Sequence, residues 1–169
     1  MSEKSKRRKA ADVLSVIIFV LILLTVAFIF FNSSLPRDNS QEESNFVGEL
    51  LRPILNPDNR FSEREYSTLT RKLAHFTEYF WLGAELTALW FCQRRFSLWA
   101  RLFIALATAV CDESIQILSG RGPKVSDILI DFSGALTGML VLYLLGTLIV
   151  FLDEKRRNKH SGLTAVYKK

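Results

Sequence analysis

The feature that most constrains this 169-residue chain is the separation of its apolar and charged residues into alternating blocks. Apolar residues fill four blocks, and each is long enough to cross the ~30 Å hydrocarbon core of a bilayer as a helix. Lysine and arginine gather between the blocks, as they do in the loops of membrane proteins. The pattern predicts an all-α polytopic membrane protein, a bundle of four transmembrane helices at about residues 13–31, 73–92, 98–118 and 128–152.

The distribution of positive charge predicts the orientation of the chain. The basic segment 1–12, the short loop with Arg94 and Arg95, and the basic tail 153–169 lie on one side if the chain crosses four times. The positive-inside rule assigns that side to the cytoplasm. We therefore expect cytoplasmic termini and an extracellular loop at 32–70. The net charge of +5 is explained by these loops, so nucleic acid is not an expected partner.

Ionisable residues within the apolar blocks are costly and usually face the interior of a bundle. Arg71, His75, Glu78 and Glu85 recur at helical spacing and therefore share one stripe of the second block. In the predicted orientation, polar residues of three helices occupy one depth near the outer surface. We expect them to line a polar pocket open to the outer leaflet, formed by Arg71, Lys72, His75, Glu78, Asp112, Glu113, Gln116, Arg121, Asp127 and Asp131.

Two short motifs in these segments resemble those of a known family. The segment Arg71-Lys72-Leu73-Ala74-His75-Phe76-Thr77-Glu78-Tyr79 resembles the Arg-Lys-x-x-His-Phe-x-Glu-Tyr signature of VanZ-like proteins, and Asp112-Glu113-Ser114-Ile115-Gln116 resembles their Asp-Glu-x-x-Gln element. Arg121, Asp127 and Gly134 match further family positions, whereas the family often has Asn in place of Asp131. The resemblance covers roughly residues 13–150.

The resemblance implies a bacterial plasma membrane, a Gram-positive host and a link to the cell envelope. The family is named for a protein associated with resistance to teicoplanin, a glycopeptide that binds cell-wall precursors. We therefore expect a protein that modulates glycopeptide resistance. The resemblance by itself implies no defined biochemical activity.

The preferred interpretation is a pocket that binds an anionic envelope lipid or lipid-linked wall precursor, with or without processing it. Arginine offers paired hydrogen bonds to phosphate, and histidine exchanges protons near neutral pH. The candidate catalytic residues are His75, Glu78, Asp112 and Glu113. The candidate substrate-binding residues are Arg71, Lys72, Tyr79, Gln116, Arg121, Asp127 and Asp131. Membrane lipids are the expected partners, and the sequence leaves both catalysis and the oligomeric state open.

Three other interpretations stay open. No cofactor is expected, but a divalent metal ion held by His75, Glu78, Asp112 and Glu113 is an alternative, since carboxylates and imidazole are metal ligands. A small proton-coupled or oligomeric transporter is a second, because Glu85 lies near mid-bilayer. The third is a structural membrane protein whose buried charges only pair with one another.

The chain has no phosphate-cradling glycine loop and no Gly-x-Ser-x-Gly elbow, which argues against nucleotide enzymes and serine hydrolases.

Overall fold

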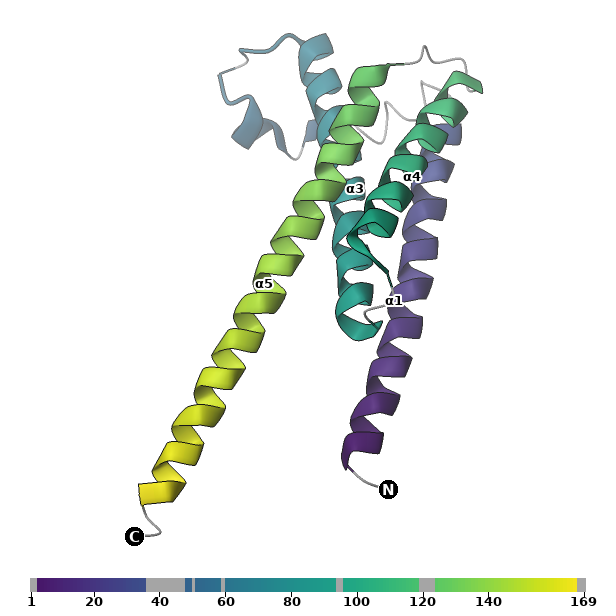
Figure 1. The fold of residues 1–169 in the computed structure, drawn as a ribbon. Helices are drawn as coiled ribbons and strands as arrows, with labels where there is room; N and C mark the ends of the chain where they lie inside the picture. The colour runs from purple at the N-terminus through teal and green to yellow at the C-terminus, as the bar shows by residue number, and fades with distance from the viewer. Residues whose placement is uncertain are drawn as a thin grey trace.

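The computed structural model describes residues 3–35, 48–49, 51–58, 60–93, 96–118 and 124–166, without the side chains at 3–4, 6–7 and 158–166. The long helices are α1 (Glu3–Ser34), α3 (Glu63–Gln93), α4 (Leu98–Leu118) and α5 (Val125–Val166) (Figure 1). A short helical segment at 51–55 precedes α3. Every regular element within the described ranges is a helix, so the prediction of an all-α chain is confirmed.

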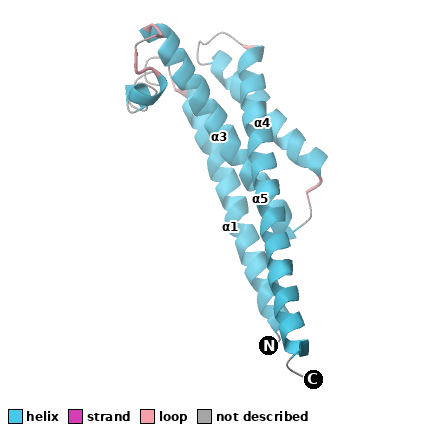
Figure 2. Ribbon diagram, turned by 90° about the vertical axis from the view of Figure 1, so that its left-hand side faces the viewer, coloured by secondary structure: helices cyan, strands magenta, loops and turns pink. Residues whose placement is uncertain are grey.

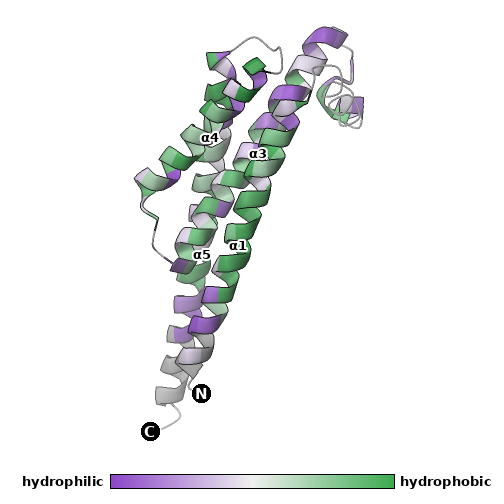
Figure 3. Ribbon diagram, turned by 90° about the vertical axis from the view of Figure 1, so that its right-hand side faces the viewer, coloured by the Kyte–Doolittle hydropathy of each residue, from purple (hydrophilic) through white to green (hydrophobic). Residues whose placement is uncertain are grey.

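Two of the helices have the length and composition of membrane-crossing segments. These are Arg8–Ser34 within α1 and Val125–Arg157 within α5. Large apolar side chains on both helices are exposed, among them Leu23, Phe31 and Ile149. Figure 3 shows hydrophobic residues along the middle of the long helices and hydrophilic residues near the termini. An apolar surface of this kind suits contact with lipid.

The other two helices are long enough to cross a bilayer but are interrupted by ionisable residues. At 1.5 Å per residue, the 31-residue α3 is about 46 Å long and the 21-residue α4 about 31 Å. Glu78 and Glu85 interrupt α3, whereas Arg101, Asp112 and Glu113 interrupt α4. Four crossings, rather than two, therefore stay a prediction.

The helices form an elongated bundle in which α3 packs against the other three. Its most extensive contacts are with α5, and α1 comes next. The N- and C-terminal ends of the chain lie at the same end of the bundle, and Figure 2 shows the same arrangement from the side. α4 ends and α5 begins at the opposite end, which we call the loop end.

Close packing of α3 on α5 depends on glycines from both helices. A Cβ atom at Gly138 would overlap the backbone carbonyl of Phe80, and one at Gly134 would overlap that of Phe76. Gly83 on α3 makes the reciprocal approach to the carbonyl of Ala135. Small residues four apart let helix backbones approach closely in membranes, where dispersion contacts drive association. The glycines thus set the spacing at which residues of α3 and α5 can meet.

The start of α3 is fixed by local hydrogen bonds and by the short helical segment. Ser62 and Glu65 form a capping box, in which the Ser62 backbone N–H donates to Glu65 Oε2 at 3.0 Å. Arg52 donates to both oxygens of Glu63 at 2.7 Å, and this pairing lowers the pKa of the Glu63 carboxyl below its ordinary value. The Tyr66 hydroxyl donates to the carbonyl of Gly48 at 2.5 Å. These contacts attach part of the predicted 32–70 loop to α3.

Candidate functional site

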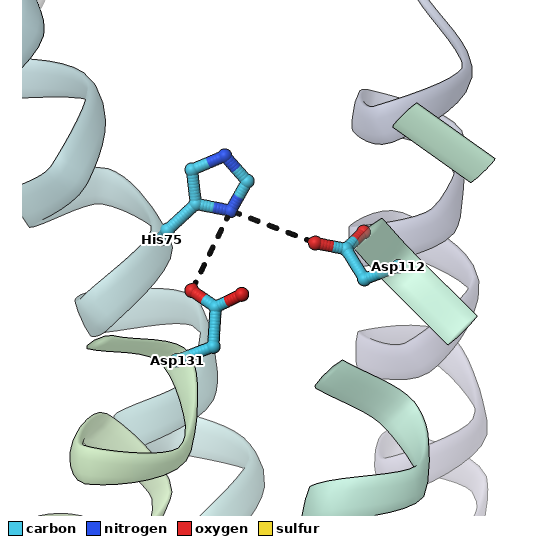
Figure 4. Close-up of side chains that lie close together, drawn as sticks. All are labelled: His75, Asp112 and Asp131. Atoms are coloured by element: carbon cyan, nitrogen blue, oxygen red, sulfur yellow. Dashed lines mark ion pairs between the residues drawn. The ribbon is translucent and has the colours of Figure 1, made fainter. Parts of the chain in front are cut away.

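The centre of the site is a histidine that faces two buried carboxylates from different helices (Figure 4). His75 of α3 has its Nδ1 atom 3.8 Å from Oδ2 of Asp112 on α4 and 3.8 Å from Oδ1 of Asp131 on α5. The two aspartate side chains are 0% and 1% exposed. Each lies six residues from the loop end of its helix, or about 9 Å along the axis. We call these three residues the central cluster.

Asp112 is held in place by hydrogen bonds from two helices. The Ser33 hydroxyl, at the end of α1, donates to Oδ1. Gln116, one turn along α4, donates from Nε2 to Oδ2 at 3.2 Å and to Ser33 Oγ at 3.5 Å. Buried carboxylates need such partners, because a polar group taken from water without a hydrogen bond costs free energy. Asp112 therefore joins α1 to α4 while its Oδ2 faces His75.

One turn closer to the loop end, an ion pair joins α3 to α5. Arg71 Nη2 lies 3.3 Å from Asp127 Oδ2, and the side chains are 19% and 12% exposed. The Ser126 hydroxyl donates to the other oxygen of Asp127 at 3.1 Å. Arg71 precedes His75 by four residues, and Asp127 precedes Asp131 by four. The pair therefore stacks on the central cluster along the same faces of α3 and α5.

Glu113 forms a hydrogen bond with the protein backbone rather than with the central cluster. Its Oε1 atom accepts a hydrogen bond from the backbone N–H of Lys124 at 2.5 Å. Lys124 is the last residue before α5, so this bond holds the start of α5 against the end of α4. This contact positions Glu113, and the catalytic role that the sequence suggested for it stays a prediction.

Glu78 faces α1 and an adjoining groove. Asn32 of α1 donates to Glu78 Oε1 at 2.9 Å. Glu85 lies two turns further along α3, and its Oε1 atom accepts a hydrogen bond from Thr25 of α1 at 3.0 Å. Both carboxylates lie at a groove of about 580 Å³ between α1, α3 and the short helical segment. The groove is mainly apolar, and its lining consists of Leu24, Thr25, Phe28, Leu51, Thr70, Leu73, Ala74, Thr77, Glu78, Trp81 and Glu85.

The remaining predicted site residues have different surroundings. Tyr79 is completely buried, and its hydroxyl has no hydrogen-bond partner within the described part of the chain. Lys72 is half-buried on α3. Arg121 lies outside the described residues. The structure thus brings His75, Asp112 and Asp131 together and connects Gln116 to them, whereas Glu78 and Glu113 have contacts of their own.

The comparisons with known proteins identify the family. Residues 17–146 match the family described as VanZ/LLP1, which is most of the 169-residue chain. The chain belongs to the VanZ/LLP1 family. The match begins within α1 and ends within α5, so it contains the central cluster and the Arg71–Asp127 pair. No curated protein and no solved structure matches the chain.

The contribution of α1 to the site of this VanZ/LLP1 protein was not predicted from the sequence. Thr25, Asn32 and Ser33 bind Glu85, Glu78 and Asp112, respectively. A signal was nevertheless present, because polar residues and isoleucines share one stripe of α1 at spacings of three and four. That stripe is Ser15, Ile18, Ile22, Thr25, Ile29 and Asn32. A repeat of this kind indicates which side of an apolar helix packs inward.

Proposed function

We propose that α1, α3, α4 and α5 all cross the plasma membrane of a bacterium, with both termini in the cytoplasm. An even number of crossings agrees with the start of α1 and the end of α5 lying at the same end of the bundle. The basic residues near both ends agree with a cytoplasmic location. Inward-facing positions account for the ionisable residues that interrupt the apolar sequences of α3 and α4. In this arrangement the central cluster lies near the outer leaflet.

The protein would there bind an anionic cell-envelope lipid or a lipid-linked wall precursor. The observation that carries this proposal is the apolar groove between α1 and α3, which runs beside the buried polar residues. Glu78 belongs to both, since it lines the groove and lies one turn from His75. Lipids have the same division into an apolar chain and a polar head. The groove suits the apolar chain of the lipid, and the polar residues near the loop end suit its headgroup.

The charges near the loop end define what kind of headgroup fits. Carboxylates repel phosphate, so an anionic head needs the cations of this region. Among the described residues, Arg71 is the candidate for binding the headgroup. Its guanidinium is only half-buried and can bind phosphate through two parallel hydrogen bonds. Lys72 is adjacent. In this proposal the phosphate would bind Arg71 beside Asp127 and would not enter the space between the carboxylates of the central cluster.

The biological role that follows is modulation of resistance to glycopeptides such as teicoplanin, in a Gram-positive host. Membership of the VanZ/LLP1 family supports a connection with resistance. A protein that sequesters or alters a wall precursor would change the amount of target available to such an antibiotic. His75, with Asp112 and Asp131 beside it, is the group best placed to exchange a proton if the lipid is also processed.

Filling the groove tests the lipid proposal. Thr77 lines the groove, is exposed, and donates its hydroxyl to the carbonyl of Leu73 at 2.8 Å. We expect Thr77→Trp to retain at least tenfold less phosphate-bearing lipid than wild type through purification in mild detergent, a loss of about 1.4 kcal/mol of binding free energy. The measurement is mass spectrometry of extracted lipid, normalised to protein.

Thr137→Trp is the matched control. Thr137 is also an exposed helical threonine that bonds to the carbonyl four residues earlier, at 2.7 Å, but it lies on α5 and away from the groove. It should retain lipid like wild type. Equal retention by both variants, or none by wild type, would contradict the proposal and favour charges that only stabilise the bundle.

A further inference from the structure

The three ligand-type side chains of the central cluster converge from three helices without forming hydrogen bonds to one another. The His75 Nδ1 atom is 3.8 Å from each carboxylate, which is longer than a hydrogen bond. One nitrogen or oxygen atom from each of the three residues lies within 4.8 Å of the others. A transition-metal ion bonds to nitrogen and oxygen at about 2.0–2.2 Å. Two such bonds would therefore bridge most of the distance between any two of these ligand atoms. Shifts of a few tenths of an ångström would complete the bonds.

Asp131 provides a separate indication that a ligand belongs in this place. Its side chain is 1% exposed, and neither carboxylate oxygen has a hydrogen-bond partner within the described part of the chain. Figure 4 shows its Oδ1 atom directed at His75, in the space that Asp112 also faces. A buried carboxylate without partners is strongly destabilising. Arg71, a nearby cation on α3, is engaged with Asp127.

We propose that His75, Asp112 and Asp131 bind one divalent metal ion of the manganese or zinc class. The ligand set of one imidazole nitrogen and two carboxylate oxygens suits these ions better than calcium or magnesium, which prefer oxygen alone. A dication offsets the charge of the two aspartates. Three protein ligands also leave a coordination position open for water, as in catalytic sites.

The neighbours of the cluster support this assignment of ligands. Ser33 and Gln116 hold the carboxylate of Asp112 in a fixed orientation, and ligating carboxylates are commonly held in this way. Glu78 and Glu113 bind Asn32 and the Lys124 backbone instead. The set therefore differs from the one predicted from sequence, in which Glu78 and Glu113 stood in place of Asp131.

The test is metal binding by the purified full-length chain without a histidine tag. The protein is treated with EDTA and then dialysed to equilibrium against Mn²⁺ or, separately, Zn²⁺, with no lipid added. We expect wild type to bind one ion per chain, and Asp131→Asn and His75→Ala to bind at least tenfold more weakly. Asp153→Asn is the matched control, because it makes the same change at an exposed position of α5 and should bind like wild type.

Thermal unfolding in the same samples separates lost ligation from lost folding. In EDTA, Asp131→Asn should unfold at or above the temperature of wild type, because the substitution removes a buried charge. Saturating metal should raise the unfolding temperature of wild type and leave that of Asp131→Asn unchanged, since only binding to the folded state stabilises it. Equal binding by wild type and Asp131→Asn, or no binding by wild type, would overturn the proposal. Neither result depends on lipid retention, which the groove variants measure.

Discussion

Replacing Gly138 by alanine should destabilise the protein by about 3 kcal/mol, the upper range for overpacking a close contact. The new methyl group would overlap the carbonyl of Phe80, which belongs to the backbone of α3 and cannot rotate away. The two helices must therefore separate, and the displacement would also move Asp131 away from His75. Thermal or denaturant unfolding in detergent measures the effect.

Gly146→Ala is the control for this prediction. A Cβ atom at Gly146 would also meet a close neighbour, but that neighbour is the end of the Phe91 ring, which can turn aside. We expect this substitution to cost less than about 1 kcal/mol. If both alanines destabilised the protein equally, the loss of glycine rather than the α3–α5 spacing would be responsible.

The second large effect is expected from Asp112→Ala. It should also lower the free energy of unfolding by about 3 kcal/mol, because buried groups that pair with Asp112 would be left without a partner. Asp112 is 0% exposed, accepts hydrogen bonds from Ser33 and Gln116, and faces His75. Without it, buried donors on α1 and α4 lose their acceptor and a small cavity forms. The loosened contact of α1 with α4 should appear as faster amide hydrogen exchange near Ser33.

Ser114→Ala, two residues further along α4, provides the comparison. Ser114 is exposed, and its hydroxyl only bonds to the carbonyl of Val110 on the same helix. The change should alter stability by less than about 0.5 kcal/mol, as is usual for surface positions. A similar loss in both variants would mean that α4 itself, and not the bonds of Asp112, limits stability.

The sequence predicted an all-α chain because long apolar blocks favour helices, in which every backbone group can bond within the segment. Gly134 and Gly138 also indicate a close approach between helices, since small residues four apart let helix backbones come together in a membrane. The common depth of His75, Asp112 and Asp131 followed from counting residues along helices that run in opposite directions.

Contacts between helices distant in the sequence were harder to predict. Spacing within α3 suggested that His75 and Glu78, three residues apart, would act together, but helix rotation directs Glu78 toward Asn32 on α1. Similarly, adjacent Asp112 and Glu113 diverge, because neighbouring residues on a helix point about 100° apart. The groove could not be predicted at all, since it depends on how α1 and the short helical segment pack on α3.

The most direct test of the central claim is protection against teicoplanin in a sensitive Gram-positive host. Wild type, His75→Ala and His160→Ala are expressed at equal membrane abundance; His160 is the only other histidine and lies in the C-terminal tail. We predict that wild type and His160→Ala raise the inhibitory concentration of teicoplanin, whereas His75→Ala gives none of this protection. Equal protection by all three proteins would contradict the claim that the central cluster carries the function.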